Sequence, residues 1–240
     1  MTTLFYAPPD RFQSGVVSLP EDESRHAAVV LRHRPGDEID VVDGFGGWHR
    51  IILTEVSPGG VKGQVRETRQ DVNEPPYRLR LALAPLKSPA RYEVFVEKAV
   101  ELGVSAITPI STERTEKSYR RGDRLQRIAI AAMKQCRRSR LLQIGGEETW
   151  NELLRGGTET LRLVCHEAAI APETIVGRMR SDGLAGGVLI AVGPEGGFSE
   201  REIDAALAAN FAAVSLGPRR LRAETAAITA AAAVMLYAQT

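Results

Sequence analysis

Residues 188–202 read VLIAVGPEGGFSERE, an apolar run followed by a glycine-rich turn and the start of a helix. Residues 188–192 are wholly apolar, as expected of a parallel strand that is buried on both faces. Ser199 followed three residues later by Glu202 is the capping-box pattern of a helix N-terminus. The stretch therefore predicts strand, turn and helix, the repeating unit of an α/β fold with a mainly parallel sheet.

The same alternation continues on both sides of this stretch. We predict further strands over residues 79–84, 104–110, 161–165 and 213–216. We predict helices that begin at Ser88-Pro89, near Leu125, at about Pro172 and at Glu224. The helix at 224–239 is rich in small residues, so its packing partner is either the core or a second subunit.

The residues before position 71 have a different pattern. Strand-like segments cover 38–42, 48–56 and 61–67, with one helix predicted over 21–32 because Ala27, Ala28, Val30 and Leu31 recur at helical spacing. This composition predicts a small β-barrel. The segment DVNEPPY at 71–77 contains two prolines and predicts a stiff linker, so we expect domains at 1–72 and 73–240.

Composition excludes several classes of protein. The 240 residues are 43% apolar and 25% charged, which is ordinary for a globular protein. The two cysteines, Cys136 and Cys165, form no C-x-x-C pair, and the four histidines form no H-E-x-x-H pair, so we expect no metal. The motifs of dinucleotide-binding, P-loop and α/β-hydrolase enzymes are missing. The first twelve residues do not resemble a signal peptide, and no apolar run reaches 18 residues, so we expect a cytoplasmic protein without a membrane span.

Positive charge is concentrated in one segment. The chain has a net charge of +1, yet residues 114–140 hold ten cations and two anions, a local charge of +8 that leaves −7 elsewhere. Such a block is either a solvated helix face or a surface for a polyanion such as nucleic acid.

Two segments carry candidate binding chemistry, and each directly follows a predicted strand. Residues 193–198, GPEGGF, contain three glycines around Glu195 and allow the backbone to approach a ligand closely. Residues 216–225, LGPRRLRAET, offer three arginine forks suited to phosphate or carboxylate. Each segment could instead be a plain turn at a helix start. Because ligands in open α/β sheets bind beyond the carboxyl ends of strands, we expect both segments to line one ligand site.

GPEGGFS followed about twenty residues later by LGPRRLRAETA resembles the knotted SPOUT-class methyltransferases, and in particular the ribosomal RNA small subunit methyltransferase E family. Other matching stretches occur in the same order: His26-x-x-Val29-Val30-Leu31-Arg32, Lys87, residues 97–104, Pro109, Thr112-Glu113-Arg114 and Ala132-x-x-Gln135-x-x-Arg138. The resemblance covers essentially the whole chain. It implies an N-terminal PUA-like barrel, a C-terminal SPOUT domain with a deep trefoil knot, and a homodimer.

The resemblance also implies the reaction and its residues. Family members methylate N3 of a uridine in 16S rRNA with S-adenosyl-L-methionine. In this chain the donor site would comprise His166, Gly193, Pro194, Glu195, Gly196, Gly197, Leu216, Gly217, Leu221 and Arg222. We expect Arg222 to stabilise the developing uracil anion and a carboxylate, Glu195 or Glu224, to take the N3 proton. Candidate contacts to the small-subunit rRNA are Arg11, Lys87, Arg114, Lys117 and Arg138.

Some positions depart from the family pattern. Arg220 stands where an apolar residue is usual, and Lys134, Arg137 and Leu142 replace residues often seen as Glu, Gly or Ser, and Pro. The changes to Arg and Lys add positive charge, so they concern RNA contacts more than the reaction class. Two other functions remain open at this point: a SPOUT enzyme that acts on another RNA or on a ribose hydroxyl, and an RNA-binding protein without catalysis.

Overall fold

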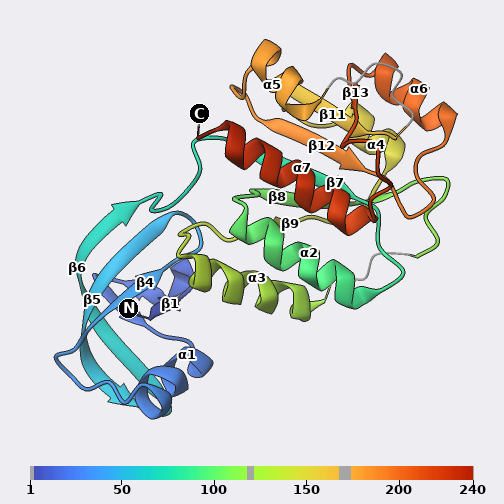
Figure 1. Cartoon of the computed structure of the whole chain (residues 1–240). Helices are drawn as coiled ribbons and strands as arrows, with labels where there is room; N and C mark the ends of the chain where they lie inside the picture. The colour runs from blue at the N-terminus through green and yellow to red at the C-terminus, as the bar shows by residue number, and fades with distance from the viewer. Residues whose placement is uncertain (1–2, 118–121, 168–173, 240) are drawn as a thin grey trace. The chain divides into compact units, whose positions relative to one another are not determined.

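The computed structural model describes residues 3–117, 122–167 and 174–239 (Figure 1). The chain forms two compact units. The first unit comprises Met1–Glu74 and Ile130–Leu141, and the second comprises Pro75–Ala129 and Leu142–Thr240. In the described residues, no helix has the length and apolar character needed to cross a membrane.

The first unit is built on a curled six-stranded sheet in the order β1-β4-β5-β6-β3-β2. Its strands are β1 Leu4–Tyr6, β2 Phe12–Gln13, β3 Val16–Ser18, β4 Glu38–Val42, β5 Gly47–Ser57 and β6 Gly60–Gln70. All described neighbours are antiparallel except β1 and β4. The predicted strands at 38–42, 48–56 and 61–67 are confirmed. The sheet is a half-barrel that curls around a core of ten buried side chains, including Phe5, Ile39 and Ile51.

The helix predicted over residues 21–32 is only partly correct. An α-helix, α1, spans Glu21–Arg25, and the chain then widens into a π-helical turn over His26–Val30. Ala27 is fully buried in the core, whereas Val30 is 63% and Leu31 37% exposed. A π-turn holds more residues than an α-turn, so residues after Ala27 rotate away from the face that α-helical spacing assigns to them. The apolar pattern at 27–31 therefore does not mark a core-facing stripe.

The predicted linker at 71–77 is fastened to a distant part of the chain. One oxygen of Glu74 accepts hydrogen bonds from the backbone N–H groups of Ser139 and Arg140, at 2.9 and 2.8 Å. The other oxygen accepts from the guanidinium of Arg138, with Nη2 at 2.8 Å and Nε at 3.1 Å. Both side chains are buried. Glu74 thus holds residues 137–141 to the first unit, which explains why this remote segment belongs to it.

The second unit contains a sheet in the order β10-β8-β7-β12-β11-β13, with β9 paired to β8. Its strands are β7 Leu79–Leu83, β8 Ala106–Ser111, β9 Gln143–Ile144, β10 Glu148–Thr149, β11 Leu161–Cys165, β12 Val188–Val192 and β13 Ala212–Val214. Every described pairing is parallel, as predicted. Strands β7, β8, β11, β12 and β13 were all predicted, whereas the two-residue strands β9 and β10 were not.

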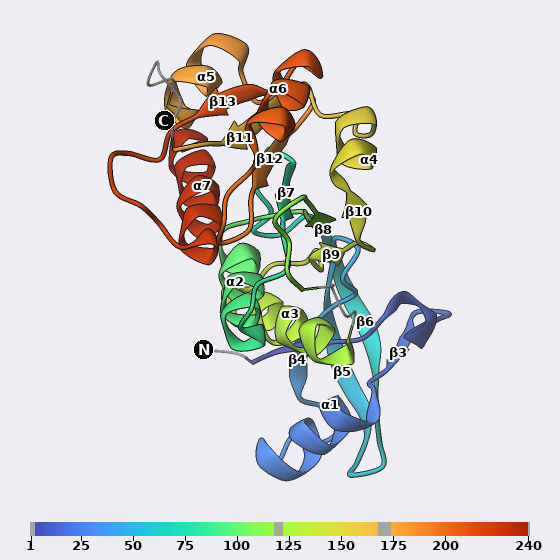
Figure 2. The same ribbon diagram turned by 90° about the vertical axis from the view of Figure 1, so that its right-hand side faces the viewer.

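Helices cover both faces of this sheet. They are α2 Pro89–Glu101, α4 Trp150–Arg155, α5 Ile175–Asp182, α6 Glu200–Ala208 and α7 Ala223–Tyr237. Helix α3, Asp123–Cys136, begins in this unit and ends in the first. Helix α7 packs against α2, α5, β7 and β12, and Figure 2 shows α2 and α7 on the side of the sheet opposite α4. The predicted start of α5 at Pro172 lies outside the described residues. Pro89 occupies the start of α2 as predicted, although Ser88 makes no side-chain cap hydrogen bond.

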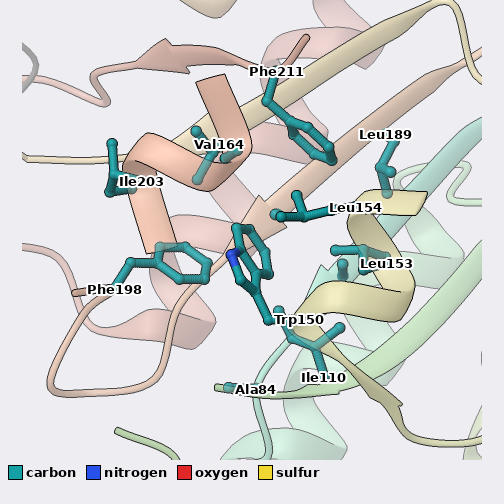
Figure 3. Close-up of a cluster of buried hydrophobic side chains, with 13 residues drawn as sticks. Ala84, Ile110, Trp150, Leu153, Leu154, Val164, Leu189, Phe198, Ile203 and Phe211 are labelled. Atoms are coloured by element: carbon teal, nitrogen blue, oxygen red, sulfur yellow. The ribbon is translucent and has the colours of Figure 1, made fainter. Parts of the chain in front are cut away.

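The face covered by α4 and α6 contains an aromatic core (Figure 3). The ring of Trp150 lies 4.6 Å from that of Phe198 and 6.2 Å from that of Phe211, measured between centroids. The indole N–H of Trp150 donates to the backbone oxygen of Glu202 at 3.1 Å. Phe198 belongs to the glycine-rich segment after β12, so this core fixes one end of that segment.

We predict that Glu74→Ala destabilises the protein by about 3 to 5 kcal/mol, because it removes the carboxylate from a buried guanidinium. Urea unfolding followed by tryptophan fluorescence measures the loss. The matched control is Asp71→Asn, which breaks the half-exposed ion pair with Arg140 and costs about 1 kcal/mol or less. Equal losses in the two variants would contradict a special role for Glu74.

Candidate functional site

The candidate site lies where three neighbouring parallel strands end. Strands β12, β11 and β13 are adjacent in the sheet and run in the same direction. Their carboxyl ends therefore meet at one edge, and the segments that follow them, starting at Gly193, His166 and Ser215, lie together. This is the arrangement predicted from the sequence, and such an edge is the usual ligand position in an open α/β sheet.

A cavity of about 530 Å³ occupies this edge. All ten residues predicted to bind a methyl donor line it: His166, Gly193, Pro194, Glu195, Gly196, Gly197, Leu216, Gly217, Leu221 and Arg222. Ten further residues line it: Arg114, Cys165, Glu167, Val192, Phe198, Glu200, Arg219, Arg220, Ala223 and Ala226. Of these, Phe198, Arg219, Arg220 and Ala223 belong to the two segments predicted to line one ligand site, and Cys165 adjoins the predicted His166. The volume lies within the range of small-molecule sites.

Glycine is required at specific points of the lining. Gly197 has φ +69° and Gly217 has φ +104°, conformations that residues with a side chain rarely adopt. A Cβ atom at Gly193 would lie 3.1 Å from the ring of Phe198 and 3.2 Å from the carbonyl carbon of Gly197. The turn at 193–198 is thus tightly packed at Gly193, whereas the backbone at Gly197 has open space around it.

Glu195 connects two strand ends. Its Oε1 accepts a hydrogen bond at 3.1 Å from the backbone N–H of Lys87, which follows β7. The Nζ of Lys87 lies 2.8 Å from Glu116, and this hydrogen bond raises the pKa of the exposed lysine. The carboxylate of Glu195 is therefore held in place at the cavity, with one of its oxygens engaged by the backbone.

The buried carboxylate of Glu202 positions the segment that carries Arg114 at the cavity. Glu202 caps α6 by accepting from the N–H of Ser199 at 2.9 Å, which confirms the predicted capping box. Its other oxygen accepts from the N–H of Glu113 at 2.8 Å. The neighbouring Arg114 then donates to the carbonyl oxygen of Gly196 at 2.8 Å. Glu202 thus places Arg114 against the glycine-rich turn.

The segment after β13 brings arginines to the cavity. Arg219, Arg220 and Arg222 line it and are exposed. Arg222 is also the N-cap residue of α7, so its backbone is fixed by the helix start. Glu224 lies in the first turn of α7, is buried, and has Oε1 at 3.7 Å from Nε of Arg91. Glu224 is absent from the cavity lining, which favours Glu195 over it as the carboxylate of the site.

The strand end at β11 supplies a thiol and an imidazole. The backbone N–H of His166 donates to the oxygen of Val214 at 3.0 Å, which ties β11 to β13 at the cavity. Burial raises the pKa of the Cys165 thiol to about 12. The thiol is therefore protonated at neutral pH and unsuited to act as a nucleophile.

The residues predicted to contact RNA differ in their environments. Arg11, Lys87, Arg114 and Lys117 are exposed. Arg138 is only 4% exposed, and its guanidinium is bound to Glu74. A phosphate cannot reach a group enclosed in this way, so we assign Arg138 a structural role and leave it out of the RNA contacts. Among the described residues, no cluster of three or more His, Cys, Asp or Glu side chains could hold a metal ion.

Comparison with known proteins agrees with this geometry. Residues 73–235 match the family described as RNA methyltransferase domain, and residues 19–66 match RNA methyltransferase PUA domain. The ribosomal RNA small subunit methyltransferase E of Synechocystis is 34% identical over 94% of this chain and 75% of its own length. The chain belongs to the ribosomal RNA small subunit methyltransferase E family.

Solved structures of similar proteins share the fold of this chain. The methyltransferase E of Neisseria gonorrhoeae, bound to S-adenosyl methionine, is 32% identical, with a TM-score of 0.85 over 98% of both chains. A probable rRNA methyltransferase of Porphyromonas gingivalis is 33% identical, with a TM-score of 0.88 over 99% of this chain and 98% of its own. The second unit is thus the SPOUT methyltransferase fold, and the first is the PUA-like half-barrel.

Two further features of the chain were not predicted from its sequence. Arg114 was predicted as an RNA contact and not as part of the cavity, since its link to the turn spans 82 residues. The N-terminus of α4 carries a capping box from Thr149 to Glu152, a signal that the sequence does contain.

We predict that Glu202→Ala destabilises the protein by about 1 to 3 kcal/mol, because it leaves two backbone N–H groups without their acceptor. Hydrogen exchange at the amides of Ser199 and Glu113 should accelerate together. Glu200→Ala, an exposed change in the same helical turn, is the control and should change stability by about 0.5 kcal/mol or less. Unchanged exchange at Glu113 would show that Glu202 does not position the Arg114 segment.

Proposed function

We propose that this protein transfers a methyl group from S-adenosyl-L-methionine to N3 of a specific uridine in small-subunit (16S) rRNA and so forms 3-methyluridine. The observation that carries the proposal is the single cavity that collects all ten predicted donor-binding residues. The chain's similarity to a methyltransferase E with bound S-adenosyl methionine supports the choice of donor. The names of the relatives support the choice of rRNA.

The residues of the cavity fit this donor. A Cβ atom at Gly197 or Gly217 would meet no other atom within 4 Å, so the backbone there is open and leaves room for a flat heterocycle. Leu216 and Leu221 offer apolar contact, and the glycine-rich turn offers backbone groups that can read an adenine edge. When bound, S-adenosyl-L-methionine supplies an electrophilic methyl group.

Arg222 is the residue proposed to stabilise the negative charge that develops on the uracil. Uracil N3 carries a proton, and its lone pair becomes a strong nucleophile only when that proton leaves and negative charge develops on the two carbonyl oxygens of the base. A guanidinium beside these oxygens stabilises the charge as it forms. Arg222 lines the cavity, and α7 fixes its backbone.

Glu195 is the proposed proton acceptor. Its carboxylate lines the cavity and is oriented by the backbone N–H of Lys87, so its second oxygen remains available to the N3 proton, directly or through water. The target base must be unpaired or flipped into this site, because N3 normally takes part in base pairing.

The remaining parts of the proposal concern partners and organisation. We propose that Arg11, Lys87, Arg114 and Lys117 bind RNA phosphates, which position the substrate without specifying it. Residues 1–72 would serve as the RNA-binding domain and 73–240 as the methyltransferase domain. A homodimer in the bacterial cytoplasm, where ribosomal subunits are assembled, completes the proposal.

The direct test uses labelled S-adenosyl-L-methionine and isolated small ribosomal subunits that lack the modification, followed by nuclease digestion and mass mapping. We expect the label as 3-methyluridine at one position. Label on another nucleoside would retain the methyltransferase and reject the uridine-N3 assignment. Bound donor without label on subunits, free rRNA or tRNA would reject the substrate.

We predict that Arg222→Gln lowers kcat about 100-fold or more, the usual effect of removing one donor to a developing anion. Rapid-quench methyl transfer at saturating donor measures the rate. The control is Arg155→Gln, an exposed arginine at the end of α4 that is absent from the cavity. Full methylation by Arg222→Gln with normal donor affinity would remove Arg222 from the mechanism.

A further inference from the structure

The helical turn after α1 exposes an unusual run of apolar side chains. Val29 is 52%, Val30 63% and Leu31 37% exposed, three consecutive residues of the first unit. Single exposed apolar residues are common on protein surfaces, but a contiguous group marks an interaction surface. We call residues 29–31 the apolar ridge.

Core contacts and hydrogen bonds of the residues on either side hold the ridge in place. Ala27 is fully buried in the core, and the rings of His26 and His33 each lie 6.1 Å from that of Phe5. The N–H of Leu31 donates to the oxygen of His26, and that of His33 to the oxygen of Ala27, both at 3.0 Å. Asp37 then binds the ring of His33 at 3.1 Å. The backbone of this turn is therefore fixed by its own contacts, and it holds the ridge residues in their exposed positions.

The backbone of this turn departs from regular structure in two places. Residues His26–Val30 form a π-helical turn, a feature found mostly as single turns and often at functional sites. Arg32 has φ +57°, which an arginine rarely adopts. An α-helical continuation would have placed Leu31 on the same face as the buried Ala27. The wider turn instead presents residues 29–31 to solvent.

Three arginines flank the ridge in the sequence, on a segment that also carries the exposed carboxylates of Glu21, Asp22, Asp37 and Glu38. Arg25 lies one helical turn before Val29, Arg32 follows Leu31 directly, and Arg34 comes two residues later. In the part of the chain that the structure describes, none of these three exposed guanidiniums forms an ion pair within 4.0 Å. Asp37 binds the ring of His33 and the backbone N–H of Arg34, and the positive charge of Arg34 also helps to lower the pKa of Asp37. Both views show the α1 ribbon at one end of the curled sheet (Figures 1 and 2).

We propose that the apolar ridge and Arg25, Arg32 and Arg34 form an RNA-binding site, in which the valines pack against unpaired bases and the arginines bind the flanking phosphates. Planar guanidinium forks match phosphate oxygens, and splayed bases expose flat faces against which side chains can pack. The inference rests on the proposed function, because it takes the same rRNA as the partner.

The test measures binding of the full-length protein to isolated small ribosomal subunits and to free 16S rRNA over a range of salt concentrations. The variants are Val29→Ser/Val30→Ser and the triple change Arg25→Gln/Arg32→Gln/Arg34→Gln. Matched controls on the same unit are Val16→Ser, a partly exposed valine in β3, and Arg66→Gln, an arginine in β6. Donor affinity and circular dichroism should match wild type in all of them.

We expect the valine variant to bind RNA about fivefold more weakly, the lower end of the effect found for aromatic side chains that stack on bases. The triple arginine variant should reduce the slope of log K against log salt by about 2, close to 0.7 for each lost phosphate contact to a single strand. The KM for subunits should rise in both, with kcat changed less than about twofold, because these contacts position the RNA.

Two results would overturn the proposal. One is unchanged RNA binding and salt slope in both variants. The other is a change in sedimentation from dimer to monomer in Val29→Ser/Val30→Ser, which would make the ridge a contact between two copies. Binding is read independently of methyl transfer. Wild-type protein that binds rRNA through the ridge without methylating it would therefore reject the proposed function and retain this site.

Discussion

The common direction of strands β12, β11 and β13 is the constraint on which the candidate site depends. Parallel strands end at the same edge of a sheet, so three loops distant in sequence meet there without needing contacts to one another. The wholly apolar composition of β12 places it inside the sheet, where its carboxyl end is flanked on both sides. Reordering these strands would disperse the cavity even if every loop kept its sequence.

Buried carboxylates that accept from backbone N–H groups hold the irregular segments in both units. Glu74 binds the amides of Ser139 and Arg140, and Glu202 binds those of Ser199 and Glu113. A carboxylate has two oxygens and can join two pieces of chain that no β-ladder connects. Removing either partner from such a buried contact lowers the stability of the fold, because an unpaired buried charge or N–H group is costly.

Much of the α/β framework could be predicted from the sequence, and the failures have physical causes. Strands β11 and β12 were predicted residue for residue because short apolar runs bounded by turns are unambiguous in an alternating pattern. The loops at the cavity were predicted from their positions after strands. The turn at 26–30 was not, since spacing shows which residues share a helical face but cannot show that the helix widens. Arg138 looked like a surface charge because its partner, Glu74, lies 64 residues away.

The division of the chain into two discontinuous units determines which fragments proteolysis or truncation can produce. The polypeptide passes between the two units at Glu74, again within α3 near Ala129, and a third time at Leu141. Neither unit is a continuous stretch, so a single proteolytic cut releases neither as an intact body. A gene fragment that ends near residue 72 would lack Arg138 and the segment that Glu74 secures. A chimaera that replaces the half-barrel by end-to-end fusion would therefore also have to supply the segment 130–141, which includes the second half of α3.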